Sequence, residues 1–249
     1  MKVGSLVSLC LAAWGGYPLA AAEGGKDRCV FPDELRSANF PLPGLKKRLQ
    51  QTSQIVVLVL GSSSSMTGQP ARNPRSYVQD LDLALQAAFP GKTFVLKNLS
   101  KRMQSAAEMA QRLPADVISG RPDLVIWQTG TVEAARHVDT NSFTDALIQG
   151  LEALRRAGID VILVGPQTHN RLATMIDVES YNDVLGQIAD RESASFLSRF
   201  DIMRYWEESG TFVLGSQDKG AQMREAGAQS QCITQILVEQ IRRAVTETQ

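Results

Sequence analysis

Residues 55–66 read IVVLVLGSSSSM, an apolar run that stops at Gly61 and continues into four serines. An unbroken run of branched apolar residues predicts a β-strand covered on both faces, as in a parallel sheet. In such a sheet the loops at the carboxyl ends of the strands line the ligand crevice. A serine in this loop is therefore placed for nucleophilic chemistry. A serine-rich loop that caps a following helix or binds an anion is the alternative interpretation.

Strand-like and helix-like segments alternate along the rest of the chain. Strands are expected at 55–60, 93–97, 123–127, 160–164 and 195–198. Helices are expected at 75–89, 105–118, 142–157, 176–191 and 226–245. Strands separated by helices of this length predict βαβ units, right-handed crossovers and a parallel sheet with helices on both faces. We therefore expect an α/β fold, a three-layer αβα sandwich whose sheet has about five strands.

The composition fits one domain with a sizeable core. The chain has 249 residues, of which 43% are hydrophobic and 21% are charged, and this size suits a single α/β domain. Lysine plus arginine equal aspartate plus glutamate at 26 each. No basic surplus is present to neutralise a phosphate backbone, so nucleic acid is not expected as a partner.

The first 22 residues have the pattern of a secretory signal peptide. Lys2 precedes an apolar run, and three alanines at positions 20–22 form an A-x-A cleavage site. No later segment is long and apolar enough to span a bilayer. We expect a periplasmic or secreted mature protein with no stable membrane span, an irregular lead-in at residues 23–50 and one domain at residues 51–249.

Signal cleavage leaves two cysteines, Cys29 near the new N-terminus and Cys232 near the C-terminus. In an oxidising compartment an even pair predicts a disulfide that ties both ends of the chain to one body. Two independent buried thiols are the alternative.

Polar clusters follow the first four expected strands, at residues 62–65, 98–105, 128–133 and 165–171, and all lie on one edge of the sheet. In this order of segments, the chain resembles the SGNH/GDSL hydrolase family, in a divergent alphaproteobacterial type with Gly-Ser-Ser and Trp-Gln-Thr-Gly-Thr blocks. The resemblance implies a flavodoxin-like SGNH hydrolase fold. It also implies cleavage or transfer of acyl esters, often acetyl groups on carbohydrates, by a Ser–His–Asp arrangement with an oxyanion hole. It implies no metal site and no organic cofactor.

The resemblance makes Ser63 the nucleophile and its N–H the first oxyanion donor. The second donor, a glycine N–H in the family, aligns with Met103. The third is the asparagine of a Gly-x-Asn-Asp block that begins here with Gly130 and Thr131. Val132 stands at the asparagine position and has no side-chain donor.

The family's Asp-x-x-His motif aligns with Asp218 to Ala221, so alanine stands where the catalytic base is expected. Only two histidines are present in the chain, His137 and His169. His137 fits a surface or helix-capping role. His169 follows the fourth strand, and it is either a solvated loop histidine or a base that has moved from its usual strand.

For an active enzyme we expect His169 as the base. The acid that orients it is Asp218, Asp177 or Glu133, and the sequence does not choose among these three. Gln128, next to Trp127 at the end of the third strand, offers an amide to a sugar ring or another small polar ligand. Ordinary packing is the alternative for this pair.

Two hypotheses of different classes follow. The first is an exported SGNH-type serine esterase or O-acyltransferase that acts on acyl esters, in the first place acetyl esters, of a carbohydrate or another small ester. The intact Gly61-Ser62-Ser63 loop favours it. The second is a binding or accessory protein of an envelope or exopolysaccharide system that has lost catalysis, and Val132 and Ala221 favour it. Both hypotheses are compatible with a polysaccharide-modification machinery as a partner.

Overall fold

The computed structural model describes residues 27–36, 39–66, 76–168 and 176–246, and the predicted signal peptide lies outside them. One sheet of five parallel strands has the order β2-β1-β3-β4-β5. The strands are β1 (Gln54–Leu60), β2 (Thr93–Asn98), β3 (Leu124–Gln128), β4 (Asp160–Val164) and β5 (Ser195–Leu197). The helices are α1 (Pro43–Gln51), α2 (Leu81–Ala88), α3 (Ala106–Arg112), α4 (Thr131–Arg136), α5 (Thr140–Arg156), α7 (Glu179–Glu192), α8 (Arg199–Glu208) and α9 (Lys219–Thr246).

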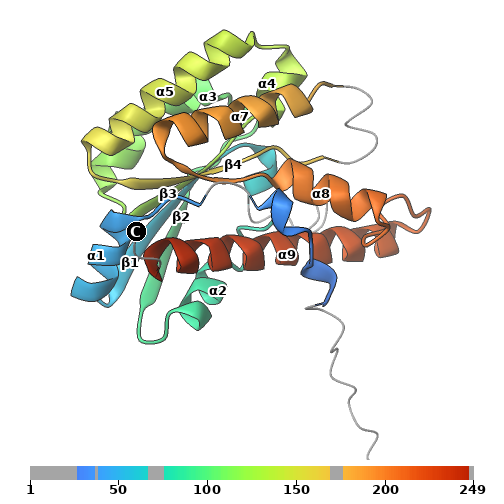
Figure 1. Cartoon of the computed structure of the whole chain (residues 1–249), viewed down its shortest axis with the longest axis horizontal. Coiled ribbons are helices and arrows are strands. Elements are labelled where there is room, and N and C mark those ends of the chain that lie inside the picture. The colour runs from blue at the N-terminus through green and yellow to red at the C-terminus, as the bar shows by residue number, and fades with distance from the viewer. Residues whose placement is uncertain (1–26, 37–38, 67–75, 169–175, 247–249) are drawn as a thin grey trace, which may run out of the picture.

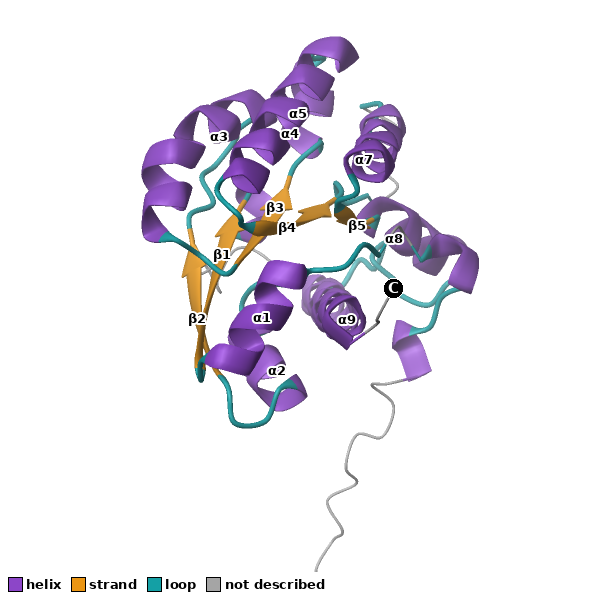
Figure 2. Ribbon diagram, turned by 60° about the vertical axis from the view of Figure 1, so that its left-hand side comes forward, coloured by secondary structure: helices purple, strands orange, loops and turns teal. Residues whose placement is uncertain are grey.

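The helices cover both faces of the sheet. In Figure 1, α3, α4, α5 and α7 lie above the strands, and α1, α2 and α9 lie below them. Figure 2 shows the twisted sheet between these two layers. Each layer has its own apolar core against one face of the sheet. The predicted three-layer αβα sandwich with a five-stranded parallel sheet is thus confirmed.

The side chains of each inner strand alternate between the two cores. In β3, Leu124 and Ile126 face the α2 and α9 side, whereas Val125 and Trp127 face the α3 and α5 side. Every residue of β3 is buried. A strand that is buried on both faces needs apolar residues at successive positions, so the continuous run in the sequence predicts this strand well.

Three helices were not expected from the sequence. The segment at 23–50 was expected to be irregular, but its last part forms α1. Pro43 stands at the first turn of this helix, where its missing N–H costs nothing and its fixed φ is already helical. The other two, α4 and α8, begin shortly after β3 and β5, and each contains several buried residues. The helix expected at 105–118 ends earlier, at Arg112, and continues as a wider turn around Pro114.

The predicted disulfide between Cys29 and Cys232 is confirmed, with the two Cα atoms 5.1 Å apart. It joins the start of the described chain to the middle of α9. Two further contacts hold this N-terminal segment: Arg28 forms an ion pair with Glu225, and the indole of Trp206 donates a hydrogen bond to the carbonyl of Val30 at 2.9 Å. No helix within the described ranges combines the length and apolar character of a membrane span.

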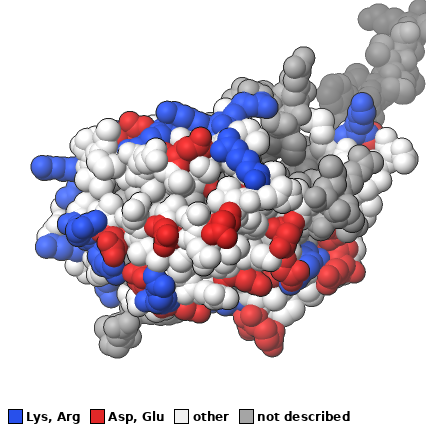
Figure 3. Space-filling view, turned by 90° about the horizontal axis from the view of Figure 1, so that it is seen from above, with Lys and Arg blue, Asp and Glu red and all other residues white. Residues whose placement is uncertain are grey.

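The surface over α5 and α7 carries both signs of charge. Figure 3 shows lysine and arginine side chains interspersed with aspartate and glutamate on this face. Many of these groups form pairs, such as Arg155 with Glu192. Among the described residues, this face therefore presents no continuous basic surface of the kind that binds nucleic acid.

A matched pair of glycine substitutions tests the packing of the sheet against α5. A Cβ added at Gly150 would lie 2.3 Å from the Trp127 ring, whereas one added at Gly227 in α9 would meet no atom within 4 Å. We expect Gly150→Ala to lower the free energy of unfolding by about 1–3 kcal/mol through overpacking. Gly227→Ala should raise it by up to about 1 kcal/mol through helix propensity. Urea unfolding of both variants measures this, and equal stabilisation by the two would contradict the packing described here.

Candidate functional site

The chain turns sharply where β1 ends, in a segment that we call the serine turn (residues 61–65). A Cβ at Gly61 would lie 2.7 Å from the Ser65 hydroxyl, so only glycine allows this close approach. Ser62 is buried and extended, and a 3₁₀ turn begins at Ser63. Ser63 itself is exposed, and no other described residue forms a hydrogen bond with its hydroxyl. The structure thus leaves the predicted nucleophile accessible at the carboxyl edge of the sheet.

Gln128 fixes the serine turn through its side chain. It is fully buried at the end of β3. Its Oε1 accepts hydrogen bonds from the Ser64 hydroxyl at 3.0 Å and from the Ser65 hydroxyl at 2.6 Å. The Ser65 hydroxyl also lies 3.2 Å from the Tyr77 hydroxyl. Gln128, expected to offer its amide to a ligand, therefore uses its carbonyl oxygen to hold the turn. Its Nε2 is buried and has no partner among the described residues.

Met103 adopts the backbone conformation of a glycine. Its φ is +53°, in the left-handed region that non-glycine residues rarely enter. Its carbonyl accepts a hydrogen bond from Arg136 Nη2 at 2.7 Å, and among the described residues its N–H has no acceptor. An N–H that is free in the loop after β2 is what the second oxyanion donor requires. The positive φ of Met103 is not indicated by its residue type, and its assignment as the second donor stays a prediction.

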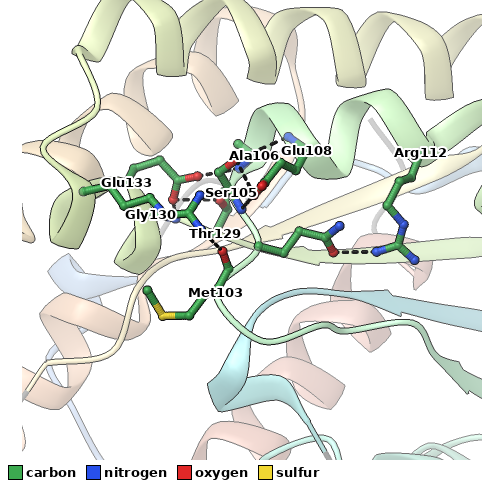
Figure 4. A network of polar contacts seen from close by, with 10 residues as sticks. Met103, Ser105, Ala106, Glu108, Arg112, Thr129, Gly130 and Glu133 are labelled. Atoms are coloured by element: carbon green, nitrogen blue, oxygen red, sulfur yellow. Dashed lines mark hydrogen bonds and ion pairs between the residues drawn. The ribbon is translucent and has the colours of Figure 1, made fainter.

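A buried carboxylate joins the loop after β2 to the loop after β3. Glu133 is 1% exposed. Its Oε1 accepts a hydrogen bond from the N–H of Ala106 at the start of α3. Its Oε2 accepts from the N–H of Gly130 at 2.9 Å and from the hydroxyl of Thr129 at 3.2 Å. Figure 4 shows these three donors converging on the one side chain. Glu133 thereby fixes the two loops that bear the expected oxyanion donors.

The start of α4 takes its shape from Gly130, whose φ is +101°. A Cβ at this position would also lie 3.1 Å from the ring of Pro166. Thr131, the next residue, has a buried hydroxyl oxygen with no partner among the described residues. Val132 is 4% exposed and packs as an apolar residue. The block after β3 thus keeps its glycine turn but has no side-chain donor at Val132.

Two of the three candidate orienting acids lie at the starts of helices. Asp218 precedes α9, is exposed, and accepts a hydrogen bond from the N–H of Gly220 at 2.8 Å. Asp177 precedes α7 and accepts from the hydroxyl and the N–H of Ser180. These two hydrogen bonds stabilise the ionised form and lower the pKa of Asp177 below its ordinary value. Glu133, the third candidate, already accepts hydrogen bonds from both of the loops that it joins.

The predicted base lies outside the described residues, because these stop at 168 and resume at 176. The other histidine, His137, is exposed at the C-terminal cap of α4, as the capping interpretation expects. Assignment of His169 as the base, with Asp218 as its partner, therefore stays a prediction. Within the described ranges, no three His, Cys, Asp or Glu side chains are grouped to hold a metal ion.

The role of Glu133 as a bridge between loops was missed from the sequence, where it was considered only as an orienting acid. A signal was present. An acid three residues after a glycine that follows a strand has the spacing of a helix-capping carboxylate. The hydrogen bond from the N–H of Ala106 to Glu133 had no such signal, because the two residues are far apart in the chain.

The family model described as the non-GDSL lipase-like family matches residues 28–247. The chain belongs to this family. No curated protein matches it.

Solved structures with the same fold include SGNH/GDSL-fold esterases. A catalytic serine-to-alanine mutant of Axe2, an acetylxylan esterase from Geobacillus stearothermophilus, is 16% identical, with 75% of this chain and 94% of that chain covered and a TM-score of 0.60. TesA is 20% identical, with 73% and 97% covered and a TM-score of 0.52. The acetyl xylan esterase AlAXEase is 16% identical, with 69% and 96% covered and a TM-score of 0.52. These similarities confirm the SGNH hydrolase fold.

Proposed function

We propose that this protein is an exported SGNH-type serine esterase or O-acyltransferase that acts on acetyl esters of a carbohydrate. One observation carries the proposal. The exposed hydroxyl of Ser63 stands at the carboxyl end of β1, in a turn that Gln128 fixes from the neighbouring strand. A nucleophile needs this combination of an accessible oxygen and a rigid backbone.

The reaction that these residues support is acyl transfer through a covalent intermediate. The Ser63 oxygen attacks the ester carbonyl carbon while its proton passes to a base, for which His169 is our candidate. Negative charge then develops on the carbonyl oxygen, and the N–H groups of Ser63 and Met103 are the candidate donors to it. Collapse of this species releases the sugar hydroxyl with the proton and leaves an acyl group on Ser63. Water completes hydrolysis, and a second sugar hydroxyl completes transfer.

The proposed enzyme should be slow. Val132 supplies no third donor, and the loss of one oxyanion donor typically lowers kcat by about 10²–10³-fold. The buried hydroxyl of Thr131, which has no partner among the described residues, lies in the same block, and a hydroxyl is able to donate a hydrogen bond to an oxyanion.

Export and the carbohydrate substrate rest on separate observations. The N-terminal segment has the pattern of a signal peptide, and the Cys29–Cys232 disulfide is typical of an oxidising compartment. The structural neighbours Axe2 and AlAXEase are acetylxylan esterases, which supports acetylated carbohydrates as substrates. A polysaccharide-modification system in the periplasm, or outside the cell, fits both observations.

A second candidate function is a binding or accessory protein with the same fold. It is favoured by Val132 and Ala221, which stand where an oxyanion donor and the base are expected. In this function the serine turn and the loops around it would bind an acylated carbohydrate without cleaving it.

Covalent labelling separates the two candidates. We expect a fluorophosphonate probe to modify the mature protein on one residue, and peptide mass spectrometry to place the adduct on Ser63. Release of acetate from acetylated xylo-oligosaccharides, measured in parallel, tests the substrate. Absence of both labelling and acetate release, with retained binding of the oligosaccharide, would instead support the accessory protein.

A further inference from the structure

Arg199 is a buried arginine beside the serine turn. It is the first residue of α8 and is separated from the end of β5 by Ser198 alone. The residue is 3% exposed. Its Nη2 donates a hydrogen bond to the Ser64 hydroxyl at 3.2 Å, and its Cζ lies 5.4 Å from the centre of the Tyr77 ring. The guanidinium group thus reaches the residue that follows the proposed nucleophile.

No described carboxylate neutralises this charge. The ion pairs between described residues do not include Arg199, and its Nε is buried without a hydrogen-bond partner. The acid nearest in sequence is Asp201, which is bonded instead to Ser198 at 2.5 Å and to Arg204 at 3.0 Å. A buried arginine is ordinarily paired, because its desolvation is otherwise uncompensated.

The surroundings of Arg199 destabilise its positive charge. Burial lowers the pKa of Arg199 to about 10, so the group is still a cation at neutral pH. Burial also raises the pKa of the Tyr77 phenol above its ordinary value, so Tyr77 is neutral at the same pH and offers only its ring face. The N-terminus of α8 adds a partial positive charge at the same place, which disfavours a cation and favours an anion.

A structural role does not explain why this residue is charged. The hydrogen bond to Ser64 could come from a neutral amide at a smaller desolvation cost. What an arginine adds is a planar fork of donors that matches a carboxylate or phosphate group. The unpartnered Nε is one donor of that fork.

We propose that Arg199 binds the carboxylate or phosphate of an acidic sugar, so that the ester substrate is carried by an anionic carbohydrate. The anion site stands on the geometry of Arg199 alone, whereas its use in ester cleavage rests on the proposed function. An acyl group on a neighbouring hydroxyl of the same or the next sugar would then be presented to the serine turn.

The test compares three ligands of matched size at equal ionic strength: D-glucuronate, D-glucose 6-phosphate and D-glucose. We expect one or both anionic sugars to raise the Tm of the mature protein by several degrees and glucose to leave it unchanged. A shift with glucuronate alone assigns the anion as a carboxylate, and a shift with the phosphate alone assigns it as a phosphate. Either result supports the site, whereas equal effects of all three ligands overturn it.

Two arginines of α8 give a matched pair of variants. Arg199→Met should weaken binding of the stabilising anion, measured by calorimetry, by about 10–100-fold, the usual range for a charge-assisted hydrogen bond. Arg204→Met, on the same helix and paired with Glu179 and Asp201, should leave this affinity within about twofold. Unchanged affinity in Arg199→Met would overturn the proposal. Should this variant not fold, Arg199→Lys keeps the charge without the fork and is expected to lose most of the affinity.

The two proposals fail in different ways. Hydrolysis of p-nitrophenyl acetate needs no anion, so turnover without any anion-dependent Tm shift would refute the Arg199 site and leave the esterase standing. An anion-dependent shift in a protein that neither turns over this ester nor reacts with fluorophosphonate would support the site and refute the esterase.

Discussion

Replacement of Ser63 by alanine is expected to lower kcat/KM for p-nitrophenyl acetate by at least about 10³-fold, because removal of the nucleophile of a serine enzyme removes the covalent pathway. The wild-type rate should itself be low for a serine esterase, for lack of a donor at Val132. Initial rates of the two mature proteins, corrected for spontaneous hydrolysis, measure the ratio.

The neighbouring serine provides the control. Ser64→Ala removes a hydroxyl that bonds to Gln128 and Arg199, so it loosens the turn but leaves the Ser63 oxygen in place. We expect its rate to fall by no more than about tenfold, the effect of a lost hydrogen bond of ordinary strength, and its fluorophosphonate labelling to persist. A larger loss in Ser64→Ala than in Ser63→Ala would show that the nucleophile has been assigned to the wrong serine.

Replacement of Glu133 by alanine is expected to lower the free energy of unfolding by about 3–5 kcal/mol. The change leaves three donors without their acceptor, the N–H groups of Ala106 and Gly130 and the hydroxyl of Thr129. Each buried unsatisfied donor costs about 1–3 kcal/mol, and water that enters the vacated space recovers part of the total. Denaturant unfolding followed by far-UV circular dichroism gives the value.

Glu108 offers a matched glutamate in the same cluster. It is about half exposed, pairs with Arg136 and completes the cap of α3 with Ser105. Glu108→Ala should therefore cost only about 1 kcal/mol, as is usual for a lost cap. Comparable losses in the two variants would mean that the buried bridge between the loops contributes no more than an exposed cap.

Glu133→Gln tests whether this carboxylate also affects esterase activity. Glu133→Gln keeps one acceptor but places an NH₂ group against a donor, so we expect a smaller loss of stability than for alanine. If Glu133 positions the loop of Met103, the glutamine variant should lose esterase activity while Ser63 is still labelled. Full activity would mean that the loop position does not depend on this carboxylate.

The inner strands were predictable because they are buried on both faces. Five parallel strands were expected, and each observed strand overlaps its predicted range closely. A residue in such a strand meets a core on either side, so an apolar run is required locally and is visible locally. The helix α1 was missed for the opposite reason. It buries only Leu45, and its lysines and its one proline look like those of a loop.

The site was only partly predictable, because its geometry depends on contacts between distant segments. Ser63 follows from the strand that precedes it. The left-handed backbone of Met103 does not follow from its residue type, since methionine rarely adopts this conformation, and neighbouring contacts such as that from Arg136 hold it. Gln128 was expected to bind a ligand, and only the packing of β3 beside β1 places it against the serines.

The sequence by itself determined the five strands, the edge of the sheet on which polar loops gather, and the cysteines that pair across the chain. Each of these is visible in residue types at particular positions along the chain. The tertiary structure alone decided that Glu133 joins two loops and that Arg199 lies buried beside the serine turn with no described acid paired to it. Burial and pairing of a charge depend on which remote side chains surround it, and no local pattern encodes that environment.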